Sequence, residues 1–139
     1  MYQELALQIA KKAHAGQVDK AGNDYILHPM TVASYMDTDT EKAVAYLHDV
    51  LENTNITVDQ LRNQFPKEIV DTVIILTRKK NKNYQNYICR VAKCRLAKKV
   101  KVADLLHNLD ITRIKEPTER DFKRLEKYRN AVLYLAMHA

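Results

Sequence analysis

The sequence predicts an all-α protein, a single domain of about eight helices. Apolar residues recur at intervals of three and four along most of the chain, as in helices that bury one face. The 139 residues include only 2 Gly and 3 Pro, too few for the many hairpins of a β-protein. We expect residues 1–139 to form one domain, because this length fits one compact unit and 46% of the residues are hydrophobic.

The first two helices are placed by an apolar stripe and by residues that start or stop helices. Residues 2–14 carry apolar side chains at helical spacing, and Gly16 lies just past their end. A loop follows over residues 16–27. Pro29 suits the first turn of a second helix at about 29–37.

The third helix is expected to run through the apolar stretch that follows. Asp39 or Thr40 can cap its start, since either side chain can accept a hydrogen bond from the first turn. The apolar period continues to Leu51 or Glu52, where the helix should end.

Capping patterns and apolar stripes place the remaining helices. Thr57 with Gln60 has the form of a capping box and starts a short fourth helix. Pro66 opens a fifth, in which the β-branched run 73–75 is also compatible with a strand, although the period favours a helix. The last three helices are expected around residues 84–91, around residues 96–109, and from Thr118, where Asp121 completes another capping box.

Positive charge is concentrated in one segment, which we call the basic belt. Residues 78–101 hold ten Lys or Arg and no Asp or Glu, whereas the whole chain has a net charge of +6. Such a belt indicates an anionic partner, either a small nucleotide or a nucleic-acid backbone; a solvated helix face is the alternative. No nucleic-acid recognition motif accompanies the belt, so a nucleotide is the favoured partner.

The sequence carries no signal for export or membrane insertion. No apolar run approaches the ~20 residues that span a bilayer, and the N-terminus lacks the basic-then-apolar pattern of a signal peptide. Cys89 and Cys94 are five positions apart, which matches neither a redox pair nor a zinc knuckle. We therefore expect a cytoplasmic protein with reduced thiols and no membrane partner.

The dipeptide His48-Asp49 carries the strongest chemical signal. It lies near the end of an apolar helical stretch that should be buried. A buried carboxylate is costly unless it is paired or bound to a cation. Because the chain has no Lys or Arg between Lys42 and Arg62, a metal ion is a natural partner for Asp49.

Two other segments supply further candidate ligands. His28 lies where a loop meets the second helix, and Asp104 lies in the middle of the seventh. Glu52 and Asn108 follow the dipeptide and Asp104 by one turn and share their faces. Each residue alone also has an ordinary interpretation: His28 as a surface or capping residue, and Asp104 as a solvent-facing residue or an ion-pair partner of Lys101.

The order of these residues resembles that of a known family. His28, His48-Asp49 and Asp104 follow the signature of HD-domain metal-dependent phosphohydrolases. Three segments are similar to the (p)ppGpp hydrolase domain of stringent-response enzymes of the RelA/SpoT type. These segments are Ala13–Gln17 with Tyr25–Pro29, Leu47–Thr54, and Val100–Leu109. The resemblance covers about residues 5–135 and implies a single HD-domain helical bundle.

The resemblance also implies roles for individual residues. It implies a divalent metal site for Mn²⁺ made by His28, His48, Asp49 and Asp104, a donor set consistent with that ion. It implies that Glu52 handles the attacking water, and we expect Asn53 to orient it. Lys20 and Asn108 match family positions close to the bound nucleotide.

Two departures from the family pattern fall at this site. Asn53 stands where the family has Asp, and an amide can orient a water but cannot take its proton. Asp19 stands where the family usually has an Arg that stacks on guanine. The resemblance therefore implies a nucleotide phosphohydrolase, acting on (p)ppGpp at the 3′-diphosphate or on a related nucleotide. The alternative is a catalytically weak domain that binds a nucleotide as a regulatory module.

Overall fold

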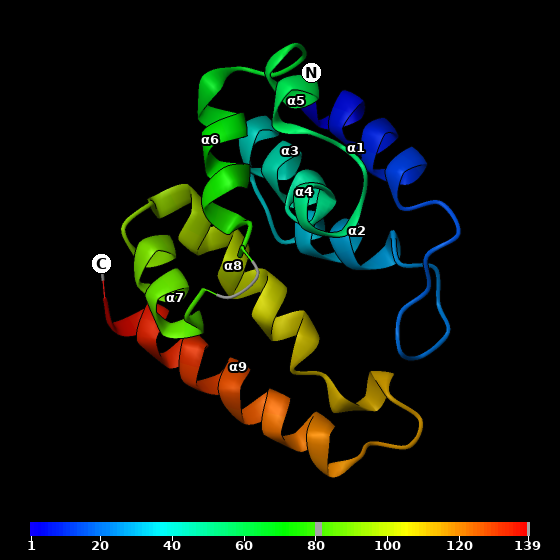
Figure 1. Cartoon of the computed structure of the whole chain (residues 1–139), viewed down its shortest axis with the longest axis vertical. Coiled ribbons are helices and arrows are strands. Elements are labelled where there is room, and N and C mark those ends of the chain that lie inside the picture. The colour runs from blue at the N-terminus through cyan, green and yellow to red at the C-terminus, as the bar shows by residue number, and fades with distance from the viewer. Residues whose placement is uncertain (80–81, 139) are drawn as a thin grey trace.

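The computed structural model describes residues 1–79 and 82–138, and the helices in these ranges are joined by loops (Figure 1). The helices are α1 (Tyr2–Ala13), α2 (Leu27–Ser34), α3 (Asp39–Leu47), α4 (Val50–Asn53), α5 (Val58–Arg62), α6 (Lys67–Leu76), α7 (Tyr84–Ala92), α8 (Arg95–Asn108), the short 3₁₀ turn η1 (Ile111–Arg113) and α9 (Glu119–Met137). The described residues contain no strand beyond one isolated bridge, between Val18 and Asp24. The predicted all-α class is confirmed.

Most helix boundaries match the sequence prediction because local capping sets them. The capping boxes of α5 at Thr57 and of α9 at Thr118 both form. Pro29 lies in the first turn of α2, although that helix already begins at Leu27 and ends at Ser34. Gly16 follows α1 with a φ of 84°, a conformation that glycine adopts without strain.

The expectation that one helix runs on to Leu51 or Glu52 is wrong. α3 ends at Leu47, and the dipeptide His48-Asp49 forms a turn before α4. The helix ends because the Ala45 carbonyl has another partner. In a continuing helix it would accept a hydrogen bond from the Asp49 N–H. Instead the His48 ring Nδ1 donates to it at 2.6 Å. The imidazole thus ends the helix and fixes its own orientation.

The predicted cap of α3 is also wrong by one residue. Thr38 is the cap: its hydroxyl accepts from the Glu41 N–H at 3.1 Å, and Glu41 Oε1 accepts from the Thr38 N–H at 3.2 Å. Asp39 has a tertiary contact instead. Its carboxylate accepts from the Met1 amine at 2.7 Å and from the first backbone N–H groups of α1.

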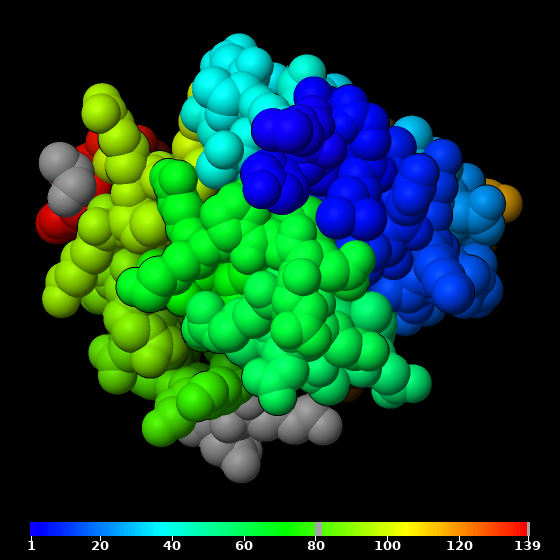
Figure 2. Space-filling model, turned by 90° about the horizontal axis from the view of Figure 1, so that it is seen from above, coloured from blue at the N-terminus to red at the C-terminus, as the bar shows by residue number. Residues whose placement is uncertain are grey.

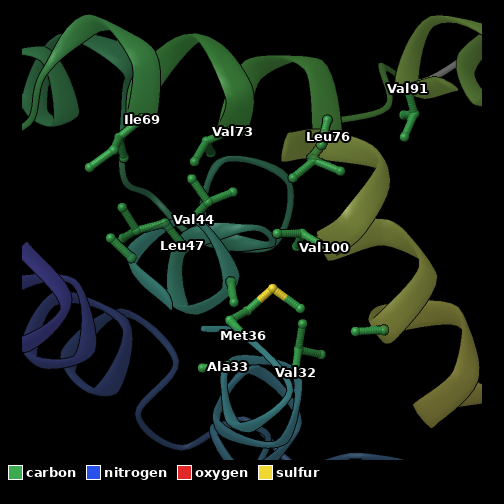
Figure 3. Close-up of a cluster of buried hydrophobic side chains, with 14 of the residues drawn as sticks. Val32, Ala33, Met36, Val44, Leu47, Ile69, Val73, Leu76, Val91 and Val100 are labelled. Atoms are coloured by element: carbon green, nitrogen blue, oxygen red, sulfur yellow. The ribbon is translucent and has the colours of Figure 1, made fainter. Parts of the chain in front are cut away.

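The hydrophobic core surrounds α3, which packs against α1, α2, α6 and α8. Figure 3 shows Val44 and Leu47 of α3 facing Ile69 and Val73 of α6, with α2 on the opposite side of α3 and Val100 of α8 beside it. Leu47, Val44, Val73 and Val100 are completely buried. Each such side chain contributes about 1.5–3 kcal/mol to stability by leaving water.

The outer helices close this core on two sides. α9 packs along α8 and α7, at the lower edge of Figure 1. α1 lies beside the segment that leads into α6, as Figure 2 shows. Tyr2 of α1 contacts Phe65 of that segment, with tilted rings whose centroids are 6.0 Å apart. None of the helices in the described ranges has the length and apolar character needed to cross a membrane.

Candidate metal centre

Three histidine and aspartate side chains converge inside this helical core. His28 comes from α2, His48 from the turn after α3, and Asp104 from the middle of α8. All three are at least 96% buried, and one ligand atom of each lies within 4.8 Å of the others. His28 Nε2 is 2.8 Å and His48 Nε2 is 3.5 Å from the same Asp104 oxygen, Oδ1.

Asp49 joins this group, so the structure brings together the four side chains predicted as ligands. Its Oδ2 lies 3.1 Å from His48 Nε2 and 4.0 Å from His28 Nε2. The turn that interrupts the helix therefore directs both members of the dipeptide to one point. We call His28, His48, Asp49 and Asp104 the HHDD cluster.

The HHDD cluster fits a divalent cation. His48 donates through Nδ1 to a backbone carbonyl, so Nε2 is the nitrogen that faces the cluster. This Nε2 is buried and, although Asp49 Oδ2 lies 3.1 Å away, it makes no hydrogen bond of suitable geometry among the described residues. Leaving a buried polar atom unsatisfied is costly, and a cation would satisfy it. Two imidazoles and two carboxylates, without thiolate, suit Mn²⁺ or Fe²⁺ rather than a structural zinc.

Further side chains hold the cluster in place from outside. Asp104 accepts hydrogen bonds from Lys101 Nζ at 2.9 Å on Oδ2 and from Asn108 Nδ2 at 3.0 Å on Oδ1. The Tyr25 hydroxyl donates to Asp49 Oδ2. The Nδ1 atoms of His28 and His107 are 2.7 Å apart. Such contacts fix the orientation of ligands and tune how strongly they bind a metal.

The electrostatics of the cluster favour positive charge. Burial by itself raises the pKa of Asp49, but His48 beside it outweighs burial and brings that pKa to about 2. Burial likewise opposes ionisation of Asp104, yet Lys101 and the two imidazoles hold its pKa well below the usual value. Burial lowers the pKa of His48, whereas Asp49 and Asp104 raise it well above normal. Two ionised, buried carboxylates therefore attract a cation into this site.

The neighbouring ring of His107 stays neutral. Burial lowers its pKa to about 4, and the nearby positive charge of Arg113 acts in the same direction. A neutral ring can accept a hydrogen bond through Nδ1, so it can hold the Nδ1 side of His28 while Nε2 faces the cluster.

A cavity of about 290 Å³ opens beside His28, and we call it the large cavity because it is the larger of two cavities that residues of the HHDD cluster line in the described part of the chain. Lys20 and Asn108, the two predicted nucleotide contacts, both line it. Lys20 Nζ pairs with Asp121 Oδ1 at 3.0 Å. Asp19, the departure from the family pattern, pairs with Arg113 at 3.3 Å and also accepts from the backbone N–H groups of Ala21 and Asn23.

The two predicted catalytic residues lie at α4. Glu52 is exposed, and its Oε1 accepts from the Arg78 N–H at 2.9 Å. Asn53 is exposed as well, and its backbone carbonyl accepts from Gln17 Nε2 at 3.0 Å. Glu52 borders a cavity that Asp49 also lines, whereas Asn53 lines no described cavity next to the cluster.

The basic belt does not form one face. Lys99 pairs with Asp37 at 2.7 Å and with Glu41 at 2.9 Å, on the side of α3. Lys101 points into the HHDD cluster, so Asp104 is an ion-pair partner of Lys101 and at the same time faces His28. Lys80 of the belt lies outside the described residues.

Sequence reasoning overlooked Tyr25 and Asp121 as parts of the site. Tyr25 lies three residues before His28, and this spacing was the one sequence signal that could have indicated it. Its contact with Asp49 depends on how α2 packs against the turn that follows α3. Asp121 was assigned only to a helix cap. It keeps that role and also binds Lys20 from a position 101 residues away.

Comparisons with known proteins show the family of this chain and its fold. The family model for the HD domain matches residues 6–137. A probable GTP pyrophosphokinase of Mycobacterium leprae is 30% identical over 135 residues, 87% of this chain. A guanosine-3′,5′-bis(diphosphate) 3′-pyrophosphohydrolase of Haemophilus influenzae is 35% identical over 117 residues, 73% of this chain. This chain spans 17% of the length of each of these two relatives.

A solved structure shares the fold. It is described as a metazoan ortholog of SpoT that hydrolyzes ppGpp, and it superposes with a TM-score of 0.82. The match covers 96% of this chain and 84% of that chain, at 23% sequence identity.

Proposed function

Because this chain belongs to the HD domain family, we propose that it is a metal-dependent phosphohydrolase whose substrate is (p)ppGpp or a closely related nucleotide. The observation that carries the proposal is the HHDD cluster, in which a buried His48 nitrogen faces two ionised carboxylates without a hydrogen-bond partner among the described residues. The names of the relatives support a guanosine 3′-diphosphate as the substrate.

His28, His48, Asp49 and Asp104 would hold the metal, and Mn²⁺ is the ion we propose. When bound, a divalent cation polarises a phosphoryl oxygen and makes water a stronger acid. The carboxylates of Asp49 and Asp104 keep their charge in this setting, because their pKa values lie below the usual range.

Glu52 is our candidate for the general base. Its Oε1 is held by the backbone of Arg78, which leaves Oε2 to take a proton from the attacking water. Asn53 follows Glu52, and its amide can orient that water without accepting its proton. Water adds to the phosphorus that is bonded to the ribose 3′-oxygen, that P–O bond breaks, and the 3′-oxygen takes up a proton. The products are pyrophosphate and GDP or GTP.

Lys20 and Asn108 are our candidates for holding the nucleotide, since both line the large cavity next to His28. Lys20 carries a positive charge into the cavity while its partner Asp121 fixes its position at 3.0 Å. Asn108 can contact the substrate from the same side chain that donates to Asp104.

The test is to incubate the purified protein with Mn²⁺ and ppGpp and to measure pyrophosphate and GDP. Asp104→Asn and His48→Gln should abolish both product release and metal binding, as measured by elemental analysis. Turnover of other nucleotides but not of ppGpp would show that the substrate is a different nucleotide, while the proposed metal-dependent hydrolysis would stand. Nucleotide binding by calorimetry without turnover under any divalent ion would instead support the regulatory module, which the replacement of a carboxylate by Asn53 favours.

A further inference from the structure

A second, smaller cavity adjoins the HHDD cluster. Its volume is about 130 Å³, and we call it the small cavity. Asn108 and Tyr128 line both cavities, but the small cavity includes Asp49 and Glu52, whereas the large cavity includes His28. The two cavities therefore reach different residues of the cluster: the large cavity reaches His28, and the small cavity reaches Asp49. At this size the small cavity suits a compact group rather than a nucleoside, because pockets for drug-sized ligands begin at about 300 Å³.

Three cations from separate parts of the fold line the small cavity. Arg78 follows α6, Lys101 lies on α8, and Lys127 lies on α9. These cations lie near the rings of two tyrosines, at cation–π distances. Lys127 Nζ lies 3.9 Å and Arg78 Cζ 5.3 Å from the centroid of the Tyr84 ring, and Lys101 Nζ lies 5.3 Å from that of Tyr87.

The positive charge in this cavity is only partly neutralised. Lys101 pairs with Asp104 at 2.9 Å. The carboxylates of Asp49 and Glu52 also line the cavity, but neither Arg78 nor Lys127 forms an ion pair with them or with any other residue within 1–79 and 82–138. Partial burial lowers the pKa of Lys127, and repulsion from Arg78 and Lys101 lowers it further. Like charges held this close favour the entry of an anion.

The hydroxyl of Tyr84 gives independent support for a ligand. This oxygen is buried and has no hydrogen-bond partner among the described residues. Burying a hydroxyl without a partner is costly, and a phosphate oxygen in the cavity could accept a hydrogen bond from it. The cavity thus offers an unsatisfied donor as well as unpaired cations.

We propose that the small cavity binds the diphosphate that is cut from the substrate, and that inorganic pyrophosphate therefore binds there by itself. The inference rests on the proposed function for the identity of the substrate. It assigns the two cavities different tasks: the large cavity holds the nucleoside end, and Arg78, Lys127 and Tyr84 hold the diphosphate beside Glu52. Lys127 belongs to α9, so the last helix contributes directly to the site.

Calorimetric titration of the Mn²⁺-loaded protein with pyrophosphate tests this assignment without any substrate turnover. Lys127→Gln and Arg78→Gln should each bind pyrophosphate about tenfold more weakly, the effect of losing one charge-assisted hydrogen bond. Tyr84→Phe keeps the ring that gathers the cations and should weaken binding about fivefold. The matched control is Lys123→Gln, an exposed lysine on α9 outside the small cavity, and it should bind as the wild type does.

Two outcomes would overturn the assignment. One is wild-type affinity in Lys127→Gln and Arg78→Gln, with folding and Mn²⁺ binding verified by circular dichroism and elemental analysis. The other is equal affinity for orthophosphate and pyrophosphate, because a site for a diphosphate should prefer pyrophosphate by about tenfold. Failure of the proposed function looks different: the protein would bind pyrophosphate in the small cavity but release none from ppGpp.

Discussion

Replacing Lys101 by Met should destabilise the protein through Asp104. The two side chains are 14% and 6% exposed, and Nζ lies 2.9 Å from Oδ2. At an effective dielectric constant of about 20, opposite charges at this distance attract by about 6 kcal/mol. Breaking such a pair from one side leaves a buried charge and costs about 3–5 kcal/mol. His28 and His48 still face Asp104, so we expect the lower end, about 3 kcal/mol.

Urea unfolding followed by circular dichroism, in buffer with a chelator, measures this effect. The control is Arg95→Met, an exposed residue at the start of the same helix, which should change stability by no more than about 0.5 kcal/mol. The double variant Lys101→Met/Asp104→Asn should be more stable than Lys101→Met alone, since no charge is then left unpaired. A Lys101→Met protein as stable as the control would refute the view that Asp104 is a buried carboxylate that depends on its lysine.

Three other predictions concern metal binding, the start of α1 and position 53. Adding Mn²⁺ at a hundredfold excess over its Kd should raise the free energy of unfolding by about 2.7 kcal/mol; His48→Gln should show no such gain in the same melts. Hydrogen bonds from the Met1 amine and the α1 backbone lower the pKa of Asp39 from 3.8 to about 2. Ionised Asp39 therefore stabilises the fold fully above pH 3.8, and this contribution is lost as the pH falls through about 2. Asp39→Asn should therefore cost about 1 kcal/mol at neutral pH and reduce the loss of stability in acid, which urea titrations across pH will measure; parallel curves for both proteins would contradict this. Asn53→Asp restores a group that can take a proton and should raise the turnover of ppGpp about tenfold; an unchanged rate would exclude position 53 from the chemistry.

The helix boundaries show which local rules are sufficient. Thr57 and Thr118 form their capping boxes as predicted, because all partners lie within one turn of the chain. Asp39 was predicted as a cap but serves the start of α1, 36–38 residues away in sequence, and Thr38 caps α3 in its place. The break after Leu47 was also missed, because the periodic pattern does not reveal a bond between the His48 ring and a backbone carbonyl.

The sequence by itself determined the helical class, the apolar faces and the order of the candidate ligands. These features depend on hydrogen bonds and side-chain periods that repeat within a few residues. Only the tertiary structure decided that His28 and Asp104, 76 positions apart, lie 2.8 Å from each other. It also decided that Asp104 serves Lys101 and the cluster together, and that Lys127 of α9 reaches the small cavity. Such contacts are set by how whole helices pack around α3, and that packing depends on the complete core rather than on any one segment.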